Sequence, residues 1–129
     1  DLPVFPGTRQ DPKITAARAE RARLDAERDA TLREHAAMLA SDYADYQRLA
    51  AAVKRQRGIL LPLAQEKVDL AMAAWRGGKG SLTELVAARR ERVDAELKAI
   101  ALEGEQLQVA ARLHYAYGDD ADPHTGVHE

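Results

Sequence analysis

The feature that most constrains this chain is a stretch of 64 residues, 13–76, with only one strong interruption of its helical pattern. At about 1.5 Å per residue, a single helix of that length spans roughly 96 Å, far more than a compact small domain. The interruption is Gly58 followed by Pro62, and a proline clashes with the carbonyl group four residues before it. Because apolar residues flank both positions, we predict a kink within one helix.

The composition favours helix-on-helix packing over a wide globular core. Apolar residues make up 46% of the chain, but aromatic residues only 5%, and alanine, the best helix former, is abundant. The 19 basic and 21 acidic residues nearly cancel, so charge gives no reason to expect nucleic acid or an anionic membrane as partner. The one basic cluster, Lys54, Arg55 and Arg57, is interpreted as surface beside the kink. The absence of cysteine excludes disulfides and thiolate chemistry.

Both ends of the chain differ from the helical middle. Residues 1–12 hold three prolines and a glycine, which predicts an extended segment leading into the helix, with Asp11 as N-cap and Pro12 at the first helical position. We expect this start to be the interior of a longer protein, and no signal-peptide pattern is visible in it. Residues 119–129 are polar and predict a disordered tail.

The helix ends at a glycine-rich turn. Gly77, Gly78 and Gly80 supply backbone conformations that other residues resist. Ser81 and Glu84 then have the spacing of a capping box, which predicts a second helix from Leu82 to about residue 117. The sequence therefore predicts an all-α fold over residues 13–118: a long antiparallel coiled-coil hairpin with unequal arms and its tip at 77–81.

Each arm carries two apolar stripes at heptad spacing. The first arm has a large-residue seam, which shifts by one position after Pro62, and a stripe of small residues. The seam comprises Leu32, Leu39, Tyr46, Val53 and Leu60, then Leu61, Ala64, Val68, Ala71 and Trp75; the small stripe comprises Ala30, Ala37, Ala44, Ala51 and Gly58. The return arm has Val86, Val93, Ile100 and Leu107 on one stripe, and Ala88, Ala95, Leu102, Val109 and Ala116 on the other.

A two-helix hairpin needs only one seam per helix, so two seams predict further neighbours, as in a bundle or a ring of helices. The unequal lengths of the two arms support the same conclusion. If the chain folds at residues 78–79, Val53 lies near Gly104, and residues 13–38 have no partner within the chain. We therefore expect self-association, or coverage by other parts of a larger protein.

The candidate sites are few, and none suggests an enzyme or a cofactor. The turn residues Gly77, Gly78, Lys79, Gly80, Ser81 and Leu82 are either a plain helix–helix connection or a docking surface. They do not form a phosphate-binding loop, because the G-x-x-x-x-G-K-S/T spacing is absent. His124, His128 and Asp122 in the tail are weak candidates for metal ligands, and a solvated tail is the favoured interpretation.

Taken in order, these features resemble a known family. The segments LPVFPGTRQDP and ILLPLAQEKVDLAMAAWRGGKGSLTELVAARRERVDAEL are similar to the C-terminal part of TolC-type outer membrane efflux channels, especially the heavy-metal efflux branch. The family's turn pattern is matched by Trp75, Gly78, Ser81, Leu82 and Leu85. Family members are much longer, with two such repeats, so this chain corresponds to about their last third.

The resemblance implies a fragment of a periplasmic helical barrel that belongs to a homotrimeric channel in the cell outer membrane. Residues 1–7 would end a strand of the membrane barrel, and the turn at 77–81 would dock onto the periplasmic adaptor, which joins the channel to an inner membrane pump. Two alternatives stay open. One is an adaptor hairpin, although its arms should be of similar length, and the other is a generic coiled-coil oligomerisation module.

Overall fold

The computed structural model describes residues 11–118, and every ordered element among them is helical. The elements are α1 (Asp11–Arg55), the π-helix η1 (Gln56–Leu60), α2 (Leu61–Arg76) and α3 (Leu82–Gly118). Asp11 and Pro12 already lie in α1, so the expected extended segment stops at least two residues earlier than residue 12. The rest of that segment, and the tail at 119–129, lie outside the described residues. The chain divides after Leu39 into two units, which are described separately.

In the first unit, residues 11–38 form a helix whose residues are all exposed. Its surface is stabilised locally, because the Arg23 guanidinium bonds Glu20 at 2.7 Å and Glu27 at 2.9 Å, one turn away on either side. The exposed residues nevertheless include large apolar side chains, among them Ile14, Leu24, Leu32 and Met38.

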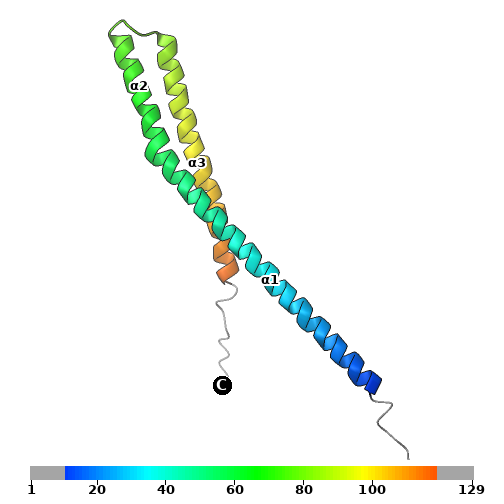
Figure 1. Ribbon diagram of the computed structural model, residues 1–129. Coiled ribbons are helices and arrows are strands. Elements are labelled where there is room, and N and C mark those ends of the chain that lie inside the picture. Colours follow the sequence, from blue (N-terminus) through cyan, green and yellow to red (C-terminus); the bar gives the residue numbers. More distant parts are fainter. Residues whose placement is uncertain (1–10, 119–129) are drawn as a thin grey trace, which may run out of the picture. The chain divides into compact units, whose positions relative to one another are not determined.

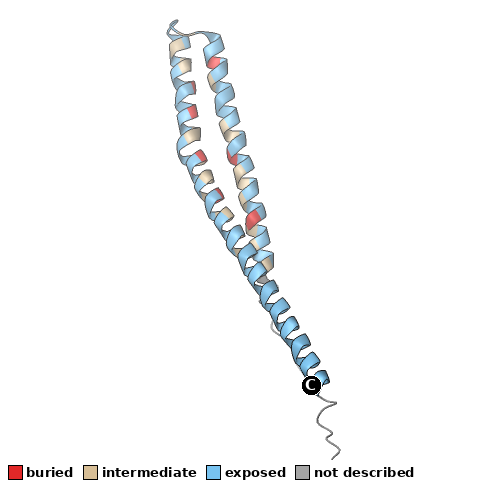
Figure 2. Cartoon of the chain, turned by 45° about the vertical axis from the view of Figure 1, so that its right-hand side comes forward, coloured by how far each residue is buried: buried red, intermediate tan, exposed pale blue. Residues whose placement is uncertain are grey.

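In the second unit, α2 and α3 lie side by side and are joined by a short turn (Figure 1). Figure 2 shows the buried positions on the facing sides of the two helices. The core is narrow: among residues 11–116 its buried apolar members are Leu49, Ala64, Val68, Leu85, Ala99 and Val109, and Gln56 is the one buried polar residue. Two ion pairs join the first arm to α3: Lys67 Nζ lies 2.9 Å from a carboxylate oxygen of Glu91, and a guanidinium nitrogen of Arg112 lies 3.4 Å from a carboxylate oxygen of Asp42.

The structure decides which stripe of α3 pairs within the chain. Val109 is buried, and Ala88, Ala95, Leu102 and Ala116 on the same stripe are half-buried. The other stripe stays exposed along its whole length, at Val86, Val93, Ile100 and Leu107. On the first arm the large-residue seam is buried or half-buried from Leu39 to Ala71, whereas its end members Leu32 and Trp75 are exposed. Ala44, Ala51 and Gly58 of the small stripe are exposed.

The backbone stays helical through Gly58 and Pro62, but it changes from α to π geometry before the proline. The N–H of Leu61 donates to the carbonyl of Gln56, five residues earlier. A π turn holds one extra residue, and such turns bend helices at identifiable points. This extra residue absorbs the one-position shift in the seam, so Leu60 at the end of the π turn is half-buried and Ala64 after it is buried. The sequence anticipated the shift but not the π turn that accommodates it.

Candidate functional site

The turn between α2 and α3 is held by backbone hydrogen bonds. Gly78 has a φ of +69°, the left-handed conformation in which side chains other than glycine are strained. The N–H of Lys79 donates to Ala74 O at 2.9 Å, and the N–H of Gly78 donates to Trp75 O at 3.1 Å. These are the two bonds of a Schellman motif, and they satisfy the carbonyls of Ala74 and Trp75 in the last turn of α2.

Gly80 packs directly on the end of α2. A Cβ atom added there would lie 2.9 Å from Cβ of Ala74 and 3.2 Å from the backbone nitrogen of Trp75. Its N–H shares the Ala74 carbonyl as acceptor at 3.0 Å. Glycine is therefore required at this position by close approach, whereas Gly78 is required by its backbone conformation.

The start of α3 is closed by the predicted capping box. The N–H of Glu84 donates to Ser81 Oγ at 3.1 Å, and the N–H of Ser81 donates to Glu84 Oε2 at 3.0 Å. These reciprocal bonds satisfy two of the donors that a helix start leaves free. Together with the Schellman motif they give the turn a defined shape, which is what a docking surface needs.

The exposed side chains around this turn include apolar and cationic ones beside the polar residues of the capping box. Trp75 is 45% exposed and Leu82 is 57% exposed, each within one helical turn of the glycines. Arg76 and Lys79 are also exposed. The structure thus keeps the six predicted docking residues, 77–82, in one short segment, with Gly80 half-buried and the other five exposed.

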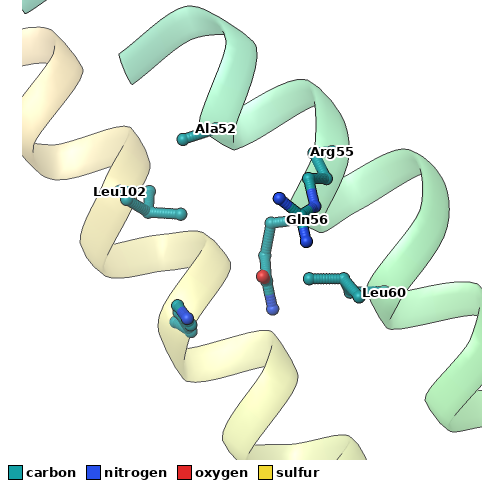
Figure 3. Close-up of a pocket in the computed structure, with 6 residues that line it drawn as sticks. Ala52, Arg55, Gln56, Leu60 and Leu102 are labelled. Carbon is teal, nitrogen blue, oxygen red and sulfur yellow. The ribbon is translucent and has the colours of Figure 1, made fainter. Parts of the chain in front are cut away.

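The second predicted pair lies at the π turn, with Gly58 inside it and Pro62 at the start of α2. Two side chains that connect the arms here, Gln56 and Arg57, were not predicted from the sequence to do so. Gln56 is 4% exposed, and its Nε2 donates to Ala95 O at 3.0 Å. Figure 3 shows its side chain between the two ribbons, near Leu60 and Leu102, beside a hollow of about 220 Å³. No sequence signal pointed to Gln56, because it lies on neither of the two stripes predicted for the first arm.

Arg57 was interpreted from the sequence as part of a surface cluster, but it bridges two carboxylates on α3. Its guanidinium bonds Glu96 at 2.5 Å and Glu103 at 2.7 Å. The hydrogen bond from Arg57 lowers the pKa of Glu103, and the same pair of carboxylates, Glu103 foremost, raises the pKa of Arg57. Lys54 and Arg55 instead line a shallow hollow with Ala51, Gly58 and Ile59. Gln56 and Arg57 therefore connect the two arms through contacts to α3.

Residues 11–118 contain no cluster of three or more His, Cys, Asp or Glu side chains that could hold a metal ion. The weak candidates Asp122, His124 and His128 lie outside this range. Within the same range, no helix has the length and apolarity needed to cross a membrane. Neither a scan against models of protein families nor searches of curated proteins and of solved structures found a match to the chain.

Proposed function

We propose that this chain is a periplasmic helical-barrel segment of an outer membrane channel, which works in a tripartite efflux pump and docks its turn onto the periplasmic adaptor. In this proposal the helix pair is an antiparallel coiled-coil hairpin with unequal arms, and neighbouring hairpins complete the wall. The segment forms part of the wall of the conduit and docks onto the adaptor, and it does not change the transported substrate chemically. The sequence resemblance described above supplies the family, and the substrate class it suggests is heavy metals.

The observation that carries the proposal is the second apolar stripe of α3. Val86, Val93, Ile100 and Leu107 are each at least half exposed, on the side of the helix away from the buried seam. Their spacing covers roughly 30 Å of helix at 1.5 Å per residue. Fully burying a side chain of this kind is worth about 1.5–3 kcal/mol, so leaving four in water favours association through this face.

The first arm supports the same arrangement. Its exposed face presents the small residues Ala44, Ala51 and Gly58 in the same heptad spacing. A Cβ added at Gly58 would meet nothing within 4 Å, so the chain itself does not require glycine there for space. A face of small residues allows another helix to approach closely, which suits a wall in which every helix has a neighbour on each side.

The two alternatives fit these observations less well. An adaptor hairpin should have arms of similar length, whereas the first arm, 11–76, far exceeds the 37 residues of α3. A generic oligomerisation coiled coil explains the exposed stripe, but it does not require a glycine turn closed by both a Schellman motif and a capping box.

Sedimentation velocity over a wide range of protein concentration tests the lateral contacts. We expect the unmodified chain to self-associate, and the double variant V93D/I100D to be monomeric with unchanged helical content. The matched control A87D/A101D adds the same charges to exposed α3 positions outside both stripes and should still associate. A stable monomer at high concentration, or equal loss of association in the control, would contradict the proposal. Crosslinking from Lys79 to the tip of an adaptor hairpin tests docking separately.

A further inference from the structure

The tip end of the helix pair carries a charge opposite to that of the rest of the chain. Between residues 70 and 90 there are four cations and a single acidic residue, although the chain as a whole has a formal charge of −2. All four cations are exposed: Arg76, Lys79, Arg89 and Arg90. None of them forms an ion pair with the other residues of the described range 11–118.

The single carboxylate of this segment, Glu84, leaves it with a formal charge of +3, four cations less one acidic residue. Glu84 is held by the capping box, where its Oε2 accepts the N–H of Ser81 at 3.0 Å. Between the cations lie exposed apolar side chains on both helices, namely Trp75 at the end of α2 and Leu82 and Val86 at the start of α3. Tryptophan and arginine are the residues most enriched at energetic centres of protein interfaces.

We infer that the tip recognises an acidic protein partner: a helical hairpin tip whose exposed carboxylates surround an apolar side chain that covers Trp75 and Leu82. This inference rests on the proposed function, whose adaptor it describes chemically. Charge complementarity specifies the partner and speeds its capture, while the apolar contact supplies the lasting affinity.

The same observations argue against two other occupants. A second copy would bring an equally cationic tip, and like charges facing each other are unfavourable. Binding to a lipid bilayer would be favoured by apolar side chains clustered at the tip of the helix pair. Here the exposed apolar row continues from Leu82 through Val86 and Val93 along the side of α3, where a helix can lie. The turn itself is fixed by its own backbone bonds and by the packing of Gly80 on Ala74.

Trp75 is the only tryptophan in the chain, so its fluorescence reports the tip directly. The full chain would be titrated with two synthetic helical hairpins that are identical except for four Glu or four Lys around a tip leucine. Vesicles of phosphatidylcholine, with and without half phosphatidylglycerol, form the other arm. We expect the Glu hairpin alone to shift the Trp75 emission to the blue, with affinity that falls as salt rises.

Charge reversal makes the test specific. The variant R76E/K79E should bind the Glu hairpin roughly tenfold more weakly and gain affinity for the Lys hairpin, because each exposed ion pair contributes a modest amount. The control R21E/R28E makes the same charge change at exposed positions far along the sequence and should bind like the unmodified chain. Equal binding of both hairpins, binding of neither, or a blue shift only with anionic vesicles would each overturn the inference.

The barrel proposal and the acidic-partner inference can each be refuted without the other. If the chain associates laterally but the Glu hairpin does not bind, only the inferred partner chemistry is wrong. If the Glu hairpin binds a chain that stays monomeric, the acidic-partner inference stands and the barrel proposal loses its support.

Discussion

The same substitution, glycine to alanine, should have opposite effects on stability at two positions of this chain. At Gly78, φ is +69°, and an alanine forced into the left-handed conformation costs about 1–2 kcal/mol. At Gly104, inside α3, a Cβ atom would meet nothing within 4 Å. Alanine there should stabilise the fold by about 0.5–1 kcal/mol, because glycine loses more backbone freedom in a helix. The two variants should therefore differ by roughly 1.5–3 kcal/mol.

Urea denaturation followed by circular dichroism at 222 nm measures this difference. With a slope of about 1–3 kcal/mol per molar urea, the midpoints of G78A and G104A should lie about 1 M apart, on opposite sides of the unmodified chain. The protein must be dilute enough that the midpoint no longer depends on its concentration, since association adds stability by mass action. A G78A variant as stable as the unmodified chain would refute the reasoning, because it would mean that the Schellman turn does not constrain residue 78.

Two further predictions concern the capping box at the start of α3 and the ion pair between Arg57 and Glu103. S81A removes the hydroxyl that accepts the Glu84 N–H and should cost about 1 kcal/mol in the same urea assay; an unchanged midpoint would show that water replaces this cap fully. In the folded chain the hydrogen bond from Arg57 lowers the pKa of Glu103, so the ionised carboxylate stabilises the folded state. This contribution is fully present above the ordinary glutamate pKa of about 4.3, and it is lost as the pH falls through the lower pKa of the folded state. The loss of stability between neutral pH and about pH 3 should therefore be smaller in E103Q than in the unmodified chain. E105Q, which removes an exposed carboxylate that has no ion pair within residues 11–118, is the control, and equal acid sensitivity of all three proteins would contradict the assignment to Glu103.

The turn was the most predictable part of the candidate site, because its chemistry is local. Three glycines followed by Ser81 and Glu84 specify a helix end and a capping box within a few residues, and the hydrogen bonds agree with that pattern. The bridge formed by Arg57 was not predictable. Its partners Glu96 and Glu103 lie 39 and 46 residues further along the chain, and nothing near Arg57 distinguishes it from the neighbouring cations.

By itself, the sequence determined the helical fold, the position of the turn, the two apolar stripes on each arm and the phase shift beside Pro62. These features depend on backbone preferences and on spacing, which are local properties. Only the tertiary structure decided which stripe of α3 is buried, how a π turn absorbs the shifted residue, and why Gln56 can occupy the core. The physical reason is that hydrophobicity alone does not select the buried stripe. The stripe that stays exposed has the larger apolar side chains, whereas the buried one includes three alanines, so the choice depends on the side chains that face α3 from the other arm. That choice leaves Val86, Val93, Ile100 and Leu107 exposed for a partner outside the pair.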